Sequence, residues 1–326
     1  MLLAADVGGT NTRFALFSEG GTLRRRSQVA NDEVASFDAA LSAFLAQEAA
    51  DAGTLGAAAI GVAAPVAGRV ATLTNRAWTV DADALAQRLG APVVLANDLE
   101  ILAEGVFAPT AFQASAPPLV LRDRRRTGVR GVVVATGTGL GATFAANHTG
   151  LPPVLFPSEA GHVLAPAFDD QAAHFHKFLA KRLDFPLITV EHVTRGRALS
   201  DGYAFFAKRE VPTEPAEDPN RAVVRRALDD GDEAALAAVL LYVDTVAVAL
   251  RDLAVLGVAR AGVYIGGSIV TSLAPLLEAA IEVRFDEPHP MATLLGDVPV
   301  FLISDGDAAL RGAASMASRL TLQNSN

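Results

Sequence analysis

Residues 2–17 of the chain read LLAADVGGTNTRFALF, two apolar runs joined by a turn of two glycines and a threonine. Glycines let the backbone of such a turn approach a ligand closely and present successive N–H groups to an anion. Asp6 stands near the end of the first run, where a carboxylate can hold a hydrated Mg²⁺ beside phosphates. The stretch therefore predicts a β-hairpin, and it leaves open whether the hairpin is purely structural or binds a phosphorylated ligand.

A second stretch, VVVATGTGLGATFA at residues 132–145, repeats this order of apolar run, Gly/Thr turn and apolar run. When the two turns are aligned, Gly139 stands opposite Gly9 and Thr136 stands opposite Asp6. Only the first turn therefore offers a carboxylate to a metal. Two such turns, one in each half of the chain, could clamp a polyphosphate from both sides.

A third pair of glycines, Gly266 and Gly267, follows the apolar run 263–265 and precedes a helical pattern that begins at Ser268. Strand, glycines and helix in this order allow a flat ligand such as adenine, or its ribose, to approach the backbone. The alternative is a tight loop between a strand and a helix. Taken alone, the pair does not separate these two interpretations.

Composition limits the classes of protein to which the chain can belong. A length of 326 residues exceeds most single hydrophobic cores, which predicts two domains. The net charge of −9 argues against nucleic acid as the main partner, and the absence of cysteine excludes disulfides, thiolate metal sites and thiol nucleophiles. Charged residues interrupt the apolar stretch 234–258, so it suits a buried helix better than a membrane span. With no basic leader before Asp6, we expect a cytoplasmic protein.

Strand-like and helix-like segments alternate along the first hundred residues. Ser36 is a helix-capping residue type before a helical pattern that reaches about residue 49. We expect a small α/β domain over residues 1–108, a closing helix in residues 305–326 that returns to it, and a large α/β domain over 109–304. Further expected elements are strands at 57–63, 92–96 and 298–303, helices at 171–182, 234–256 and 307–320, and an exposed loop at 211–220. The charged cluster at 122–126 is expected to be a solvated loop.

Asn97 and Asp98 follow an apolar run and precede a helical pattern. Open α/β sheets bind ligands at such strand-to-helix positions. One interpretation is a helix N-cap, which either residue could provide. The other makes Asp98 a general base that accepts the proton of a substrate hydroxyl, kept ionised by the helix N-terminus.

Glu159 and His162 stand three residues apart after a proline-rich loop, a spacing at which both side chains can grip adjacent hydroxyls of a polyol. Metal ligation is an alternative, but no second His or Cys lies nearby at ligand spacing. Glu191 can be an acid in the first turn of a helix or a further ligand of the same kind. We expect His174 and His176 to lie on the surface of an ordinary helix.

Seven short motifs in order resemble those of the bacterial glucokinases, the ATP-dependent group within the actin-like sugar kinase superfamily. They are DVGGTN at 6–11, APVAG at 64–68, TNRAW at 74–78, ND at 97–98, GTGLG at 137–141, EAGH at 159–162 and IGG at 265–267. The resemblance covers nearly the whole chain. It implies a two-lobed, actin-like ATPase fold of duplicated ribonuclease-H-like domains, with ATP and hexose in the cleft between the lobes.

The resemblance also implies roles for individual residues. Asp98 is expected to be the catalytic base for the sugar 6-hydroxyl, and the hexose ligands are expected to be Asn75, Asn97, Glu159, His162 and Glu191. Residues expected to bind ATP are Asp6, Val7, Gly8, Gly9, Thr10, Asn11, Gly137, Thr138, Gly139, Gly266 and Gly267, with Asp6 reaching Mg²⁺ through water. Three departures from the family pattern put strict glucose preference in question. They are Leu99-Glu100 where Phe-Thr is usual, Ser158-Glu159-Ala160 where Gly-Glu-Gly is usual, and Arg197-Ala198 where Pro-Gly is common.

The expected function is phosphorylation of glucose at its 6-hydroxyl by ATP and Mg²⁺, feeding glycolysis. A kinase for another hexose, a non-catalytic sugar sensor and a bare ATPase of the actin or chaperone type are the alternatives. A sensor would need neither Asp98 nor Asp6, and an ATPase would have no use for Glu159, His162 and Glu191 together. Expected partners are glucose or a close hexose, without nucleic acid or membrane, and a homodimer is the candidate assembly.

Overall fold

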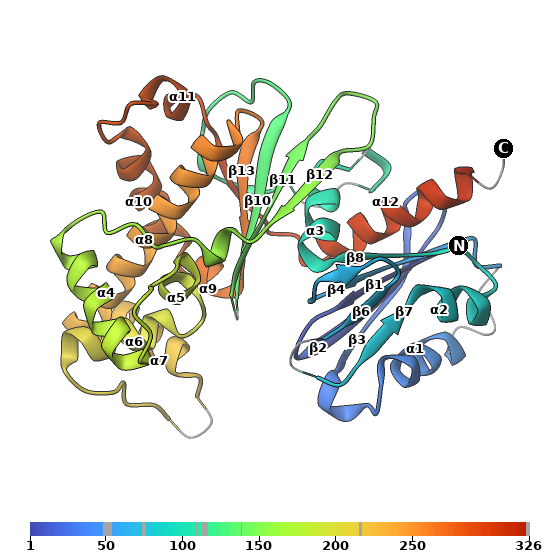
Figure 1. Ribbon diagram of the computed structural model, residues 1–326, viewed down its shortest axis with the longest axis horizontal. Coiled ribbons are helices and arrows are strands. Elements are labelled where there is room, and N and C mark those ends of the chain that lie inside the picture. The colour runs from blue at the N-terminus through green and yellow to red at the C-terminus, as the bar shows by residue number, and fades with distance from the viewer. Residues whose placement is uncertain are drawn as a thin grey trace. The chain divides into compact units, whose positions relative to one another are not determined.

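The computed structural model describes residues 1–47, 54–73, 76–108, 110–112, 117–137, 139–214 and 217–323 (Figure 1). The chain forms two compact units. Unit 1 comprises Met1–Pro117, Ala145–Phe156 and Asp305–Asn326, and unit 2 comprises Pro118–Phe144 and Pro157–Ser304. The domain division expected at residues 108 and 109 remains a prediction.

Unit 1 is built on a five-stranded sheet in the order β3-β2-β1-β4-β8. β1 pairs antiparallel with β2 and β2 with β3, whereas β4 and β8 run parallel to β1. The sheet therefore joins an antiparallel meander to a parallel half, as the alternation in the sequence indicates. The strands are β1 Leu2–Val7, β2 Asn11–Phe17, β3 Leu23–Ala30, β4 Ala57–Val62 and β8 Val93–Asn97.

Helices cover both faces of this sheet, which explains why β1 is apolar at almost every position. Leu3 and Val7 share a core with Phe37 of α1 (Phe37–Ala46) and Leu85 of α2 (Ala82–Leu89). Leu2 and Ala4 point to the other face and pack with α3 (Asp98–Phe107) and α12 (Ala308–Gln323). Because strand side chains alternate between faces, a strand buried on both sides needs a continuous apolar run. Shorter elements of unit 1 are η1 Asn31–Glu33, β5 Val66–Ala67, β6 Val70–Thr72, β7 Thr79–Asp81 and η2 Thr110–Phe112.

The second sheet, most of which belongs to unit 2, repeats the plan with six strands in the order β12-β11-β10-β13-β14-β9. The parts of β11 and β12 that lie within residues 145–156 are grouped with unit 1. β13 runs parallel to β10 and to β14, as β4 runs parallel to β1 and to β8 in the first sheet. β9 is an addition at the edge and pairs antiparallel with β14. The strands are β9 Leu119–Arg122, β10 Arg130–Thr136, β11 Leu140–Ala146, β12 Val154–Ser158, β13 Gly262–Gly266 and β14 Val300–Leu302.

The long helix α8, Glu233–Gly257, is the centre of the core of unit 2 and packs against α6, α7 and α10 (Figure 1). Among the described residues it is the one helix long and apolar enough to cross a membrane, but 67% of its most apolar window is buried inside the protein. Such burial is typical of a core helix. The other helical segments are η3 Ala160–His162, α4 Asp170–Leu183, α5 Val190–Thr194, α6 Ala198–Ala207, α7 Pro219–Leu228, α9 Ser268–Ser272, α10 Ala274–Asp286 and α11 Ala292–Gly296.

Most expected elements are present with shifts of one to three residues at their ends. Ser36 caps α1 by accepting a hydrogen bond from the Ala39 amide, as predicted. His174 is exposed and His176 half-buried on α4. The closing helix α12 begins directly after Asp307, whose carboxylate accepts a hydrogen bond from Arg26.

The prediction that residues 122–126 form a solvated loop is wrong for Arg122. Its side chain is fully buried, at the end of β9. The guanidinium donates to the carboxylates of Glu282 and Asp286 and to the carbonyls of Leu295 and Val298. A buried guanidinium is tolerated when its donors are satisfied in this way, so one charge of the cluster is part of the core.

Candidate active site

The residues predicted for catalysis in unit 1 lie at the carboxyl edge of its parallel strands. In the sheet register Asp6 pairs with Gly61 of β4, and Val62 of β4 pairs with Asn97 at the end of β8. Asp98 follows as the first residue of α3. Because β4 lies between β1 and β8, the sequence-distant Asp6 and Asp98 come to the same edge.

Asn97 is the N-cap of α3, so the helix-cap interpretation is correct for this residue. Its Oδ1 accepts from the Leu99 amide at 2.9 Å, and its Nδ2 donates to the Ala64 carbonyl at 3.3 Å. Glu100 completes a capping box by accepting from the Asn97 amide at 2.9 Å. The departure from the family pattern at position 100 therefore has a local purpose, since the Glu100 carboxylate fixes the start of the helix.

Asp98 is a carboxyl group with an unusual proton affinity. Burial, and secondly the negative charge of Asp6, raise its pKa from 3.8 to about 6, although hydrogen bonds from the Leu99 amide and others oppose the rise. A carboxylate whose pKa lies closer to neutrality is a stronger base and is still ionised in most molecules at pH 7. Helix start, burial and the neighbouring charge thus suit Asp98 to proton abstraction.

Asp6 is almost completely buried and forms an ion pair with Arg13, its cross-strand partner on β2. Arg13 Nε donates to Oδ2 of Asp6 at 3.0 Å, and Nη1 donates to the Gly306 carbonyl at 2.6 Å. Both hydrogen bonds from Arg13 to Asp6 go to Oδ2. Arg13 is not among the predicted site residues, although its position opposite Asp6 follows from a hairpin centred on residues 8–11.

The second group of predicted residues lies together in unit 2. Glu159 precedes the short helix η3, His162 is the last residue of η3, and Glu191 is the second residue of α5. The Nε2 of His162 lies 3.7 Å from Oε2 of Glu159, and both side chains are largely exposed. A hydrogen bond of 2.9 Å from the Val190 amide to the Val163 carbonyl ties α5 to the segment after η3. The two side chains therefore lie next to each other, and their role as hexose ligands remains a prediction.

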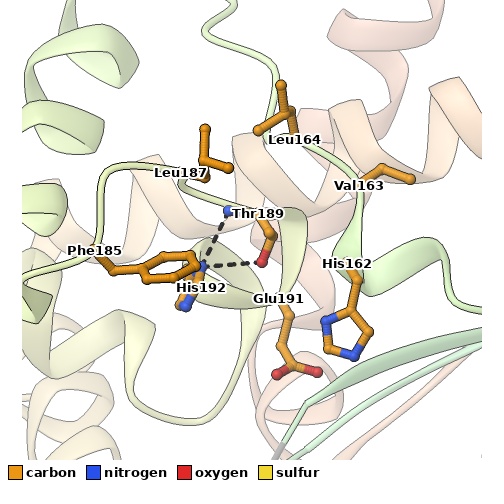
Figure 2. A pocket seen from close by; sticks show the side chains of 8 residues that line it. All are labelled: His162, Val163, Leu164, Phe185, Leu187, Thr189, Glu191 and His192. Carbon is orange, nitrogen blue, oxygen red and sulfur yellow. Dashed lines mark hydrogen bonds between the residues drawn. The ribbon is translucent and has the colours of Figure 1, made fainter.

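His162 and Glu191 also border a hollow of about 670 Å³, which Figure 2 shows from close by. Its other side chains include Val163, Leu164 and Leu187, all more than half exposed. On one side His192 lies against the ring of Phe185, with 5.7 Å between ring centroids, and its Nδ1 accepts from the Thr189 amide (Figure 2). Burial, together with Arg195 and His162, lowers the pKa of His192, so its imidazole is neutral near pH 7.

Two of the glycines predicted to bind nucleotide, Gly139 and Gly267, lie very close to neighbouring residues of unit 2. A Cβ on Gly139 would lie 2.3 Å from Oε2 of Glu191, and a Cβ on Gly267, whose φ is +146°, would lie 2.3 Å from the Thr136 carbonyl oxygen. The Gly196 amide donates to the Gly137 carbonyl at 2.6 Å. Gly266 pairs with Ala135 in the sheet register. The turn after β10, the glycines after β13 and the start of α5 are therefore neighbours.

Two predicted residues, Asn75 and Thr138, lie outside the described residues. Within the described ranges no group of three or more His, Cys, Asp and Glu side chains could hold a metal ion. Three polar residues beside these sites, Arg13, Glu100 and Asn31, were not among the predicted site residues. Asn31 is buried and contacts the first glycine turn. Of these, Glu100 had a readable signal, because Asn followed three residues later by Glu is a capping-box pattern.

The duplicated α/β fold, with a glycine hairpin in each unit and a strand-to-helix Asn-Asp pair, is the arrangement expected of a sugar kinase. The chain belongs to the glucokinase family, whose model matches residues 3–320. The glucokinase of Cupriavidus metallidurans is 30% identical over 98% of this chain and 94% of its own.

Solved structures share the fold. The glucokinase from an Antarctic psychrotroph superposes with a TM-score of 0.81 at 24% identity, over 98% of both chains. A ROK family glucokinase from Streptomyces griseus, solved in complex with glucose and AMPPNP, superposes with a TM-score of 0.64 at 20% identity, over 98% of this chain and 99% of its own.

Proposed function

We propose that this enzyme transfers the γ-phosphoryl group of ATP to the 6-hydroxyl of glucose, with Asp98 as the general base. The observation that carries the proposal is the environment of Asp98 at the start of α3, where burial and Asp6 raise its pKa to about 6. Phosphoryl transfer needs positioning and charge neutralisation more than covalent help, so one well-placed base is enough. Asp98 takes the proton of the 6-hydroxyl as the hydroxyl oxygen attacks the γ-phosphorus. The bond from the γ-phosphorus to the β,γ-bridging oxygen breaks, and ADP leaves.

An assay that couples ATP turnover to glucose 6-phosphate formation tests this proposal. The wild-type enzyme should consume ATP only when glucose is present. Asp98→Asn should lower kcat by about 10² to 10⁴, the usual contribution of a positioned base, while calorimetry still detects glucose binding. Glucose-independent ATP hydrolysis would favour a bare ATPase, binding without turnover would favour a sensor, and an Asp98→Asn variant with more than half of the wild-type kcat would make Asp98 only a helix residue.

For the nucleotide, we propose the two hairpin turns, residues 7–11 and 137–139, as phosphate-binding loops and Gly266–Gly267 as the adenosine loop. The support is their backbone geometry. Gly9 and Gly137 have open space around their Cα atoms, so a phosphate can approach the backbone there, and Gly267 adopts a φ that L side chains rarely reach. The related enzyme from Streptomyces griseus was solved with an ATP analogue.

Mg²⁺ fits this donor set, with Asp6 as its protein contact through water. Mg²⁺ keeps several waters and is commonly bound by one or two carboxylates together with substrate phosphates. A single carboxylate with one oxygen held by Arg13 agrees with that pattern better than with a cage made only of protein ligands. When bound, the ion would neutralise charge on the transferred phosphoryl group.

For the sugar, we propose Asn75, Asn97, Glu159, His162 and Glu191 as hexose ligands. Glu159 and His162 are exposed and adjacent, and Glu191 borders the same hollow as His162. Several side chains that line this hollow are apolar, whereas a hexose presents mainly hydroxyl groups. The preferred sugar should therefore be determined by comparing glucose with other hexoses. Relative kcat/KM values for glucose, mannose, fructose and N-acetylglucosamine would assign the preferred substrate.

We further propose that the enzyme acts in the cytoplasm and assembles as a homodimer. The family membership supports the location, since glucose phosphorylation draws on the cytoplasmic pool of ATP. Sedimentation of the purified enzyme with and without glucose would measure the assembly, and a single species of 33.8 kDa would contradict the dimer.

A further inference from the structure

Asn31, at the start of η1, is a buried residue that belongs to none of the family-like motifs. Its side-chain amide and its backbone N–H contact the first glycine turn or the residue that follows it. Its Nδ2 donates to the Gly8 carbonyl at 2.8 Å, and its backbone amide donates to the Thr10 carbonyl at 2.8 Å. Its Oδ1 accepts from the Thr12 hydroxyl at 2.7 Å. Asn31 therefore holds the turn from the side of β3.

The bond to Gly8 determines which way the turn presents its backbone. In a trans peptide the carbonyl of one residue and the N–H of the next point in opposite directions. Since the Gly8 carbonyl points to Asn31, the Gly9 N–H points away from Asn31. Gly9 is exposed, and a Cβ placed on it would meet nothing within 4 Å. The Gly9 N–H is thus offered to an incoming anion.

The Thr12 hydroxyl fixes the orientation of the Asn31 amide. Both side chains are completely buried. A hydroxyl that donates to Oδ1 leaves the NH₂ end of the amide to face the Gly8 carbonyl. Arg76 adds a contact from its Nη1 to the Asn31 carbonyl at 3.1 Å, which fixes the backbone of Asn31 as well.

We propose that Asn31 is the positioning residue of the phosphate-binding turn, with Thr12 fixing its amide. The inference rests on the proposed function in one respect, that residues 7–11 bind the phosphates of ATP. Asn31 touches no substrate. It keeps the carbonyl oxygen of Gly8, which would repel a phosphate, turned inward and the Gly9 N–H turned outward.

Asn31→Asp is the sharpest test. The carboxylate keeps the size of the side chain and the acceptor for Thr12, but it has no N–H for the Gly8 carbonyl. We expect the Kd of AMPPNP and the KM of ATP to rise about tenfold, equivalent to one lost hydrogen bond to an oriented group. The Kd of glucose should change less than twofold. A purely structural brace would instead weaken both ligands equally, and that result would overturn the proposal, as would unchanged affinities.

A second pair of variants covers the case in which Asn31→Asp does not fold. Thr12→Ser keeps the hydroxyl, and Thr12→Val replaces it with a methyl group of the same shape. Thr12→Val should raise the Kd of AMPPNP several-fold above that of Thr12→Ser, with similar glucose affinity. Equal nucleotide affinity in the two variants would overturn the proposal. Because calorimetry with AMPPNP does not require turnover, the result stays separate from the wild-type assay for glucose phosphorylation.

Discussion

Gly139 and Glu191 are in direct contact: a Cβ atom on Gly139 would lie 2.3 Å from the Oε2 atom of Glu191. The first residue belongs to the turn after β10, and the second belongs to α5. A glycine is required at position 139 so that the carboxylate can occupy its place. The turn that we propose to bind phosphate therefore restricts the position of Glu191, a proposed hexose ligand, and Glu191 restricts the turn in the same way.

Gly139→Ala should weaken hexose binding with little loss of stability. The clashing atom is the end of a flexible side chain, so the new methyl group displaces the Glu191 carboxylate rather than the backbone. Loss of one positioned charged acceptor should raise the KM of glucose about tenfold or more. Steady-state kinetics and a melting curve test this.

Gly137→Ala is the matched control in the same turn, because a Cβ there meets nothing within 4 Å. It should leave the KM of glucose within twofold of the wild type. If both variants change the glucose KM alike, the contact with Glu191 does not limit hexose binding.

The rate of the enzyme should fall on the acid side as Asp98 takes up a proton. A general base works in its ionised form, and the pKa of Asp98 is raised to about 6. In the free enzyme kcat/KM for glucose should therefore be level above about pH 7 and fall tenfold per pH unit below about pH 5. A profile that stays level down to pH 4.5 would contradict the assignment of Asp98 as the base.

Asp98→Asn should make the folded enzyme more stable at neutral pH. The pKa of Asp98 is higher in the folded state than in the unfolded chain, so the stability that this group contributes is fully present below pH 3.8 and is lost as the pH rises through about 6. Removing the charge should raise the free energy of unfolding by up to about 3 kcal/mol at pH 8, and by less at pH 5. Denaturant titrations at the two pH values measure the difference, and an equal effect at both would point to a cause other than ionisation.

Local patterns were sufficient to predict much of the framework. The glycine turns, the apolar strands and the cap at Ser36 are visible from spacing and residue type, and the structure places them as expected. The placement of Asp6 and Asp98 at the same sheet edge follows from one further step, the rule that parallel strands meet at their carboxyl ends. The ligand roles assigned from the family resemblance remain predictions.

Side-chain contacts between residues that are far apart along the chain could not be predicted from the sequence. Arg122 looks like part of a charged loop, yet its carboxylate partners lie 160 and 164 residues later. Asn31 reads as an ordinary polar residue because its contacts with Gly8 and Thr12 depend on the pairing of β2 with β3. Such contacts arise from tertiary packing, so no local sequence pattern predicts them.

Asp6→Asn should lower the pKa of Asp98, since the charge of Asp6 is the second cause of its rise. The acid limb of the rate profile should therefore move to lower pH. If Asp6 also holds Mg²⁺ through water, the variant should need a higher Mg²⁺ concentration for half-maximal rate. An unchanged Mg²⁺ requirement would remove Asp6 from the metal site, while the shift of the acid limb tests the electrostatic coupling by itself.

Arg122→Met should destabilise unit 2 and leave the chemistry of the surviving folded enzyme unchanged. The guanidinium satisfies two carbonyls and two carboxylates and lies over the ring of Phe285, 5.3 Å from its centroid. The carboxylates of Glu282 and Asp286 are partly exposed and can be solvated, so the main loss comes from the two carbonyls and from packing. We expect the free energy of unfolding to fall by about 2–4 kcal/mol, below the full cost of leaving a buried charge unpaired.

The exposed neighbour Arg125 provides the control, because Arg125→Met removes the same charge at a surface position and should change stability by less than about 0.5 kcal/mol. Urea denaturation measures the free energy of unfolding of both variants. If Arg122→Met were as stable as Arg125→Met, Arg122 would behave as the solvated charge that the sequence predicted.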